Sequence, residues 1–114
     1  MATTKSYSDL EQSRILAEIL PLESADMKIL PFTERVYRVV PINDIAVCGR
    51  EDEIYAWSLA ALIDVLPNGI VMNKDSQTGR YHFSSKYIGT YVTADNPVDA
   101  CVAMIEKLHE LNLL

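Results

Sequence analysis

One short stretch constrains the fold of this chain most strongly, residues 58–67, Ser-Leu-Ala-Ala-Leu-Ile-Asp-Val-Leu-Pro. Ser58 suits a helix N-cap, because its hydroxyl can accept a hydrogen bond from a free amide of the first turn. Trp57 before this cap and Leu62 after it have the spacing of a hydrophobic staple, and Pro67 stops the helix. A helix of about two and a half turns is not stable alone in water, so it must pack against the rest of the chain.

A second helix is predicted near the N-terminus. Ser8 and Glu11 form an S-x-x-E capping box, in which the two side chains each satisfy one free amide. We expect this helix to run from Asp9 to about Leu20, because Pro21 cannot continue its hydrogen-bond ladder. The preceding residues 1–7 carry no such signal, and we expect them to be flexible.

The C-terminal helix has the clearest start of the three. Asn96 is a capping residue, Pro97 occupies the first helical position, and Asp99 places negative charge in the first turn, where the helix dipole favours it. Apolar residues then recur at helical spacing as a stripe: Val98, Cys101, Val102, Ile105, Leu108 and Leu111. This helix should pack its stripe on the strands that precede it.

Between the second and third helices the pattern changes to the alternation of strands. Residues 70–73, 80–84 and 87–93 are predicted to form an antiparallel meander, with a loop at 75–79 and a tight turn around Ser85 and Lys86. Alternation places Tyr81 and Phe83 on one face of the middle strand and Arg80, His82 and Ser84 on the other. We expect Tyr81, Phe83, Tyr87 and Tyr91 to face the core.

The region before the central helix is harder to interpret. We expect residues 21–28 to be a loop with at most one short helical turn, residues 32–40 to contain one strand, and residues 45–48 to be a weaker candidate for another. The fold class is therefore α+β: a three-stranded meander, or a four-stranded one if an earlier strand joins it, packed against two to three helices. Residues 1–114 fit a single domain.

Charge and apolar content bound the class of protein. The net charge is −6, which repels nucleic acid overall, yet residues 69–94 carry three basic side chains against one acidic. No run of 18 apolar residues occurs, and Cys48 and Cys101 lack paired spacing. We therefore expect a soluble cytoplasmic protein with reduced thiols and no membrane partner; a single disulfide between Cys48 and Cys101 is the alternative.

The reactive side chains are better explained by packing than by chemistry. Cys48, His82, Cys101 and His109 are too far apart in sequence for the paired ligands of a structural zinc site. Cys101 belongs to the apolar stripe, and Ser58 lacks the glycine-flanked turn of a hydrolase nucleophile. We predict no metal, no cofactor and no enzymatic activity.

Three segments, residues 23–27, 56–67 and 95–108, resemble small uncharacterised proteins of phages, prophages and other mobile elements of gut anaerobic bacteria. The likeness lies in an Ala-Asp-Met segment, a Trp-Ser-Leu helix ending in Leu-Pro, tyrosine-rich strands, and a helix that opens with Asp-Ala-Cys. It matches poorly over residues 32–53. The resemblance implies a mobile-element origin, in a bacterial host cell, and implies no activity.

Two interaction hypotheses follow. The first is a protein-interaction module that self-associates, with Trp57 and Met72 as interface candidates and an edge strand of the meander that a second copy can extend. The alternative is weak binding of single-stranded nucleic acid on the basic, tyrosine-rich meander. Its candidate residues are Arg80, Tyr81, His82, Lys86, Tyr87 and Tyr91.

Overall fold

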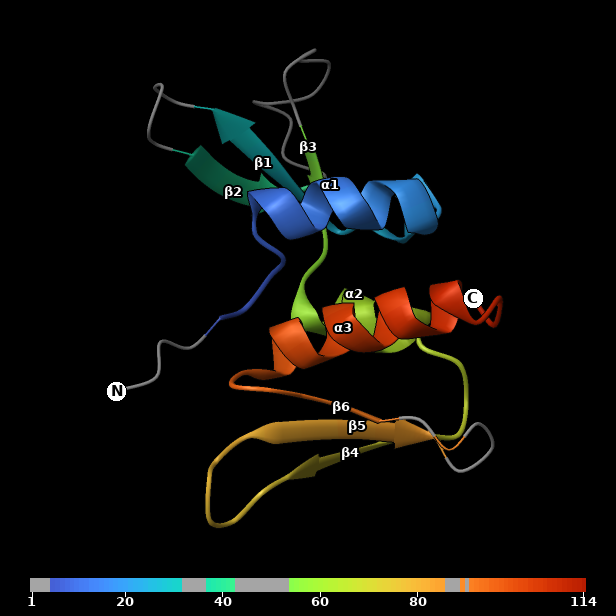
Figure 1. Cartoon of the computed structure of the whole chain (residues 1–114). Coiled ribbons are helices and arrows are strands. Elements are labelled where there is room, and N and C mark those ends of the chain that lie inside the picture. Colours follow the sequence, from blue (N-terminus) through green and yellow to red (C-terminus); the bar gives the residue numbers. More distant parts are fainter. Residues whose placement is uncertain (1–4, 32–36, 43–53, 86–88, 90) are drawn as a thin grey trace.

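A computed structural model describes residues 5–31, 37–42, 54–85, 89 and 91–114 of the chain. Within these residues, three α-helices and two three-stranded antiparallel sheets form an α+β fold (Figure 1). The predicted fold class is confirmed, including the meander. The other sheet was not predicted as a sheet, but the strand expected within residues 32–40 is present in it at Tyr37–Pro41.

Helix α1, Leu10–Ile19, begins one residue later than the sequence suggested. Its N-cap is Asp9, whose carboxylate accepts a hydrogen bond from the Gln12 amide at 2.8 Å, and the Gln12 side chain accepts one from the Asp9 amide at 3.1 Å. The capping box is thus Asp9 with Gln12, and the prediction of Ser8 with Glu11 was wrong. Ser8 is instead fully buried, where its hydroxyl accepts a hydrogen bond from the Trp57 amide at 3.0 Å.

Helix α2, Leu59–Val65, confirms the central prediction from the sequence. The Ser58 hydroxyl accepts a hydrogen bond from the Ala61 amide at 3.2 Å, as an N-cap should. Trp57 and Leu62, the two staple positions, are both 0% exposed. The helix ends at its C-cap, Leu66, directly before Pro67.

Helix α3, Pro97–Glu110, also begins as predicted, with the Asn96 side chain accepting a hydrogen bond from the Asp99 amide at 2.9 Å. Its buried side is the centre of the main hydrophobic core. The core also takes Leu16 and Leu20 from α1, Trp57 and Leu62 from the α2 region, and Phe83 from the meander. The buried residues of α3 are Val98, Ala100, Cys101, Val102, Met104, Ile105 and Leu108.

The first sheet contains β1 (Met27–Pro31), β2 (Tyr37–Pro41) and β3 (Ile54–Ala56), in the order β2-β1-β3. The predicted short helical turn is present at Leu22–Ser24, but β1 begins inside the segment that we expected to be loop. It pairs with β2, the next strand in the chain, and with β3, which lies more than twenty residues away. The possible strand at residues 45–48 lies outside the described residues.

The second sheet is the predicted meander, with β4 (Ile70–Lys74), β5 (Tyr81–Ser85) and β6 (Tyr91–Ala94) in the order β4-β5-β6. Met72 is opposite Phe83, and Phe83 is opposite Val92. The turn predicted around Ser85 and Lys86 falls partly on residues that are not described. In Figure 1 the helices lie between the two sheets, with α1 towards the first sheet and α3 directly against the second.

Residues 5–7 are bound to this core, in contrast to the expected flexibility of residues 1–7. The Ser6 carbonyl accepts a hydrogen bond from the Leu59 amide at 3.0 Å, and Tyr7 forms an isolated β-bridge with Ser58. Lys5 forms ion pairs with Asp9 at 2.9 Å and Asp99 at 2.8 Å. These partners are distant in sequence, except for Asp9, so local sequence could not reveal them; residues 1–4 lie outside the described residues.

Candidate interaction surface at the edge of the second sheet

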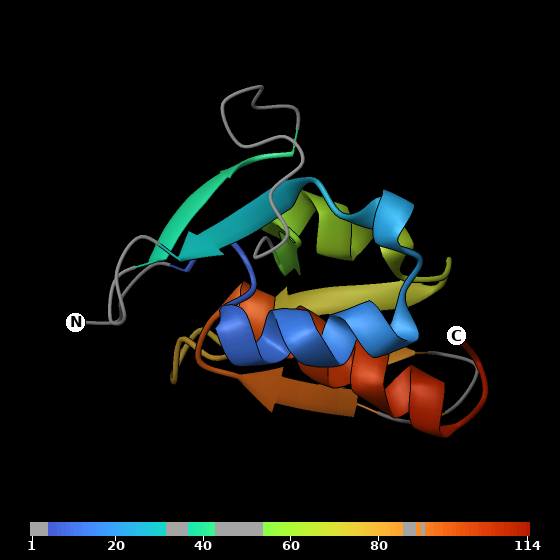
Figure 2. The same ribbon diagram turned by 90° about the horizontal axis from the view of Figure 1, so that it is seen from above.

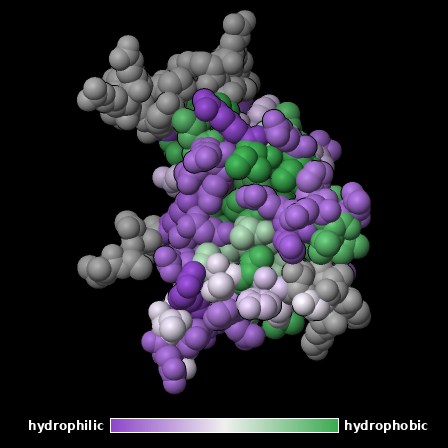
Figure 3. Space-filling view, viewed as in Figure 1, coloured by the Kyte–Doolittle hydropathy of each residue, from purple (hydrophilic) through white to green (hydrophobic). Residues whose placement is uncertain are grey.

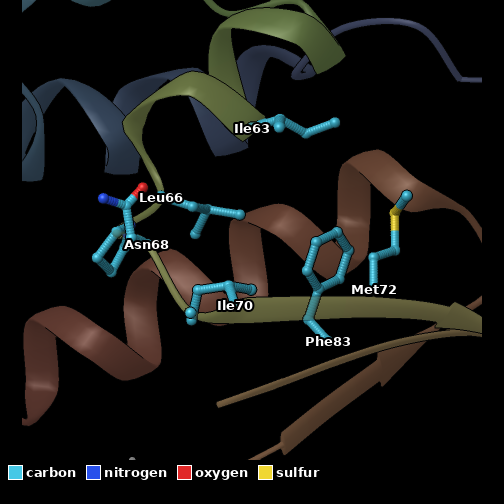
Figure 4. A pocket seen from close by; sticks show the side chains of 8 residues that line it. Ile63, Leu66, Asn68, Ile70, Met72 and Phe83 are labelled. Atoms are coloured by element: carbon cyan, nitrogen blue, oxygen red, sulfur yellow. The ribbon is translucent and has the colours of Figure 1, made fainter. Parts of the chain in front are cut away.

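An apolar cleft of about 260 Å³ lies between the end of α2 and the inner face of β4 (Figure 4). The close-up shows Ile63 and Leu66 on the helix side of this cleft, with Ile70, Met72 and Phe83 on the sheet side. The turn that joins α2 to β4 closes one end, and Gly69 has a φ of 92° there, which a glycine adopts without strain. The cleft is lined by Ile63, Leu66, Pro67, Asn68, Gly69, Ile70, Met72 and Phe83.

The cleft is open because α3 covers only part of the sheet. Helix α3 packs on β6 and β5 and also against α2, so the inner face of β4 is left at the margin of the core. Figure 2 shows α2 and β4 on the same side of α3. Two apolar side chains at this margin remain in contact with solvent: Ile63 is 44% exposed and Met72 is 48% exposed.

The edge of β4 that faces away from β5 runs along this cleft, and the direction of its backbone polar groups follows from the register. The Asp75 amide donates to the Arg80 carbonyl at 2.8 Å, and Asp75 and Arg80 continue the β4–β5 pairing by one step. Hydrogen-bonded and non-hydrogen-bonded pairs alternate along an antiparallel ladder. The backbone groups of residues 71 and 73 therefore point to β5, and those of Ile70, Met72 and Lys74 point outward.

These outward-pointing residues also have their side chains on the cleft face. Ile70 and Met72 line the cleft, and the Lys74 ammonium lies 5.3 Å from the centre of the Tyr81 ring. In the described part of the chain, β5 is the one strand that pairs with β4. A strand added at this edge would therefore meet backbone donors and acceptors and an apolar cleft on the same side.

The face of the meander away from the helices carries a different set of side chains. Tyr91 is opposite Ser84 on this face, and with 70% exposure it is the most exposed of the large hydrophobic residues described. The expectation that Tyr91 faces the core was wrong, because its pairing with Ser84 places it on the same face as His82. The side chains of this face are Val71, Asn73, His82, Ser84, Tyr91 and Thr93.

The residues proposed for nucleic-acid binding are split between the two faces. Tyr81 shares the inner face with buried Phe83, and Arg80 forms an ion pair with Asp95 at 3.3 Å. The His82 imidazole lies 3.9 Å from the Asp75 carboxylate. Of the six candidates, His82 and Tyr91 share the outer face, while Lys86 and Tyr87 lie outside the described residues.

Trp57, one of the two interface candidates, is not available for binding. Its side chain is 0% exposed, and its indole N–H donates a hydrogen bond to the Ser24 hydroxyl at 2.9 Å. The assignment of Trp57 to an interface was therefore wrong, and its role is in the core. Met72, the other candidate, lies in the cleft and is half exposed.

Two candidate nucleophiles also have structural roles. Burial raises the pKa of the Cys101 thiol to about 12, so the thiol stays protonated at neutral pH. The Ser58 hydroxyl donates a hydrogen bond to the Asp26 carboxylate while capping α2, and the Ser58 amide donates to the same carboxylate at 2.8 Å. No three His, Cys, Asp or Glu residues of the described ranges gather as a metal site would require.

A polar cluster ties the N-terminal segment to α1 and α3. Partial burial raises the pKa of Asp99, but hydrogen bonds from Lys5, Gln12 and Asn96 outweigh this effect and leave the pKa below its usual value. Partial burial likewise lowers the pKa of Lys5, but hydrogen bonds to Asp99 and Asp9 raise it above its usual value. Because its partners satisfy one another, this cluster links the N-terminal segment to α1 and α3 and does not form an open site.

The chain matches no protein-family model, no curated protein and no solved structure. Among the helices of the described residues, none combines the length and the apolar character needed to span a bilayer. Function is therefore inferred from the geometry of the cleft and of the β4 edge.

Proposed function

We propose that this protein is a non-enzymatic interaction module that binds a protein partner by strand addition at β4. The single observation that carries the proposal is an open cleft, lined largely by apolar side chains, beside an edge of β4 that no other strand of the described residues pairs with. In this mode of recognition, main-chain hydrogen bonds supply affinity, and pockets for alternate side chains supply specificity.

The geometry defines what the partner must look like. Its strand pairs with the outward-pointing backbone groups of Ile70, Met72 and Lys74, so it is extended and has no proline at the pairing positions. Every second side chain points towards the cleft. At least one of these is apolar, because the cleft walls of Ile63, Leu66 and Phe83 offer no charged partner.

A non-enzymatic role is supported by what the candidate reactive groups do. Cys101 is buried in the core with a raised pKa, and Ser58 is engaged in a helix cap and in hydrogen bonds to Asp26. The cleft itself is lined by apolar side chains, an asparagine amide and turn backbone. These surroundings suit binding of an apolar side chain and offer no general acid or base.

The likeness of residues 23–27, 56–67 and 95–108 to phage and prophage proteins supports a place among the accessory proteins of mobile elements. We propose that the module acts in the cytoplasm of a bacterial host cell. A partner encoded by the host or by the same element is consistent with this role.

Site-specific photocross-linking tests the binding site. A benzophenone amino acid replaces Met72 in one variant and Asn73 in a matched control, in bacterial cells that produce the protein. Asn73 is on the same edge strand, but its side chain is on the outer face and its backbone points to β5. We expect a protein adduct from position 72 and a much weaker one from position 73; equal labelling, or none, contradicts the proposal.

Single-stranded nucleic-acid binding remains the second candidate, since one observation favours it. Tyr91 is 70% exposed on the same face as His82, as an aromatic platform for a base requires. Titration of a short oligo(dT) at low salt is expected to give salt-dependent binding that is lost in Tyr91→Ala. The matched control is Tyr81→Phe, on the inner face; no binding by the unmodified chain would remove this candidate.

A further inference from the structure

We propose that the strand added to β4 is β4 of a second copy of this chain, paired antiparallel around a twofold axis at Met72, with Met72 of each copy closing the open side of the other's cleft. This inference rests on the proposed function of the β4 edge and names its partner. A twofold interface uses the same patch on both copies, so that patch must be self-complementary.

The backbone of β4 meets this requirement. With the axis at Met72, Met72 faces its own counterpart, and Ile70 faces Lys74 of the other copy. All three residues point their backbone groups outward, so the five-residue strands form about six hydrogen bonds between the copies. If the register shifted by one residue, backbone groups that point outward on one copy would face residues of the other copy whose groups point to β5. A shift by two residues would leave fewer residues of the two β4 strands paired.

The side chains fit the same register. Directly opposite residues of an antiparallel pair lie on the same face, about 5.5 Å apart between Cα atoms in a hydrogen-bonded pair. The two Met72 side chains therefore lie side by side on the cleft face. Met72 and Ile63, which are 48% and 44% exposed in the single chain, provide the apolar surface that this arrangement covers.

Charge disfavours the registers whose axis lies nearer to Lys74. Lys74 is the one charged residue of β4, and a lysine on a sheet edge normally discourages pairing with other chains. The axis at Met72 places the two Lys74 Cα atoms at opposite ends of the pairing, roughly 13 Å apart along the strands, beyond the ~8 Å Debye length at physiological salt.

Each Lys74 then lies beside Ile70 of the other copy, at the turn that follows α2. The C-terminal end of a helix carries partial negative charge, and the last turn of α2 also contains Asp64. Registers that bring the two lysines together lose this attraction and add repulsion. The charge on Lys74 therefore disfavours every self-pairing whose axis lies closer to Lys74 than Met72 does, and the outward backbone groups and the strand length disfavour the others.

Sedimentation velocity over a range of concentrations tests the dimer. We expect the unmodified chain to show a monomer–dimer equilibrium, and Met72→Lys to raise the dimer Kd at least about a hundredfold, since two apolar contacts are replaced by facing charges. Asn73→Lys, with the same charge on the opposite face, should change the Kd less than about threefold. Circular dichroism of both variants checks that they remain folded.

A disulfide test fixes the register. In a Cys48→Ser background, Met72→Cys is expected to form a disulfide-linked dimer under mild oxidation, because the predicted Cα separation lies in the range that a disulfide spans. Lys74→Cys is the control, since its two copies lie too far apart. Linkage through Lys74→Cys, or no linkage at either position, would overturn the register.

The outcomes separate this inference from the proposed function. A chain that stays monomeric at millimolar concentration, while the photocross-linker at position 72 captures a different protein, overturns the self-pairing and leaves strand addition intact. A monomeric chain with no adduct at position 72 overturns both. A dimer that Asn73→Lys disrupts and Met72→Lys does not also overturns the self-pairing, because it places the contact on the outer face.

Discussion

Replacing Trp57 by alanine is the most severe single perturbation that the structure predicts. The indole is 0% exposed and occupies the hydrophobic core together with Leu62, Phe83 and the buried side of α3. Truncating a fully buried tryptophan costs about 3–5 kcal/mol, as lost transfer free energy plus an unfilled cavity. The free energy of unfolding of such a domain is itself only about 5–15 kcal/mol.

The expected loss can be measured as a shift in thermal unfolding. For a domain of about this length, 1 kcal/mol corresponds to roughly 4 °C in Tm, so Trp57→Ala should lower the Tm by about 12–20 °C. Trp57→Phe keeps most of the ring but loses the hydrogen bond to the Ser24 hydroxyl. That variant should lose about 1–2 kcal/mol, clearly less than the alanine variant.

Circular dichroism at 222 nm follows both variants, and fluorescence provides an independent check on the unmodified chain. Trp57 is the only tryptophan, so its emission should be blue-shifted and poorly quenched by acrylamide. A Tm within 3 °C of the unmodified protein for Trp57→Ala would refute the reasoning that places this side chain at the centre of the core.

Four further substitutions separate the structural roles of other residues. Ser58→Ala should lower the free energy of unfolding by about 1–2 kcal/mol in urea titrations, because α2 loses its cap; no change would contradict the capping role. Folding lowers the pKa of Asp99, so the stabilisation by its carboxylate is fully present above the ordinary carboxyl pKa and is lost as the pH falls through the pKa of the folded state. Lys5→Met should therefore make the free energy of unfolding fall less steeply in acid. An unchanged dependence of stability on pH would argue against the cluster. Cys101→Ser should lower Tm by burying a hydroxyl, whereas Tyr91→Ala should leave Tm within about 2 °C; a reversal of the two effects would contradict the assigned burial.

The helices were predictable because their signals are local. Ser58 and Asn96 each bond to an amide three residues ahead, and Pro67 and Pro97 act within one turn. Even so, the N-terminal cap was assigned one residue too early. Ser8 has the right chemistry for a cap, but its burial against the Trp57 amide uses that hydroxyl elsewhere, and Asp9 caps the helix instead.

In the first sheet, β2 was expected within residues 32–40, whereas β1 and β3 were missed for the opposite reason. Strand β3 has only three residues, and β1 reads locally as a loop ending in proline. β1 and β3 pair with each other across more than twenty residues, and β1 also pairs with β2. Such pairing leaves little periodic signal in a short segment, so it is weakly encoded in local sequence.

The candidate site was predictable in part. Met72 and an open edge strand of the meander were named from the sequence, whereas the cleft beside them arises from the position of α3 over β5 and β6. Tyr91 was assigned to the wrong face because the prediction counted side-chain alternation from Tyr87, at the start of a strand expected over residues 87–93. The face of Tyr91 is set by its pairing with Ser84, and a shift of one residue reverses every side chain.

Amide hydrogen exchange along β4, measured at low and high protein concentration, tests the central claim most directly. At low concentration, the amides of Val71 and Asn73 should be protected by β5, and those of Ile70, Met72 and Lys74 should exchange quickly. At high concentration we expect Ile70, Met72 and Lys74 to become protected while Tyr91 and Thr93 on the other edge remain unchanged. Fast exchange at Ile70, Met72 and Lys74 at every concentration, or new protection confined to β6, would contradict pairing at this edge.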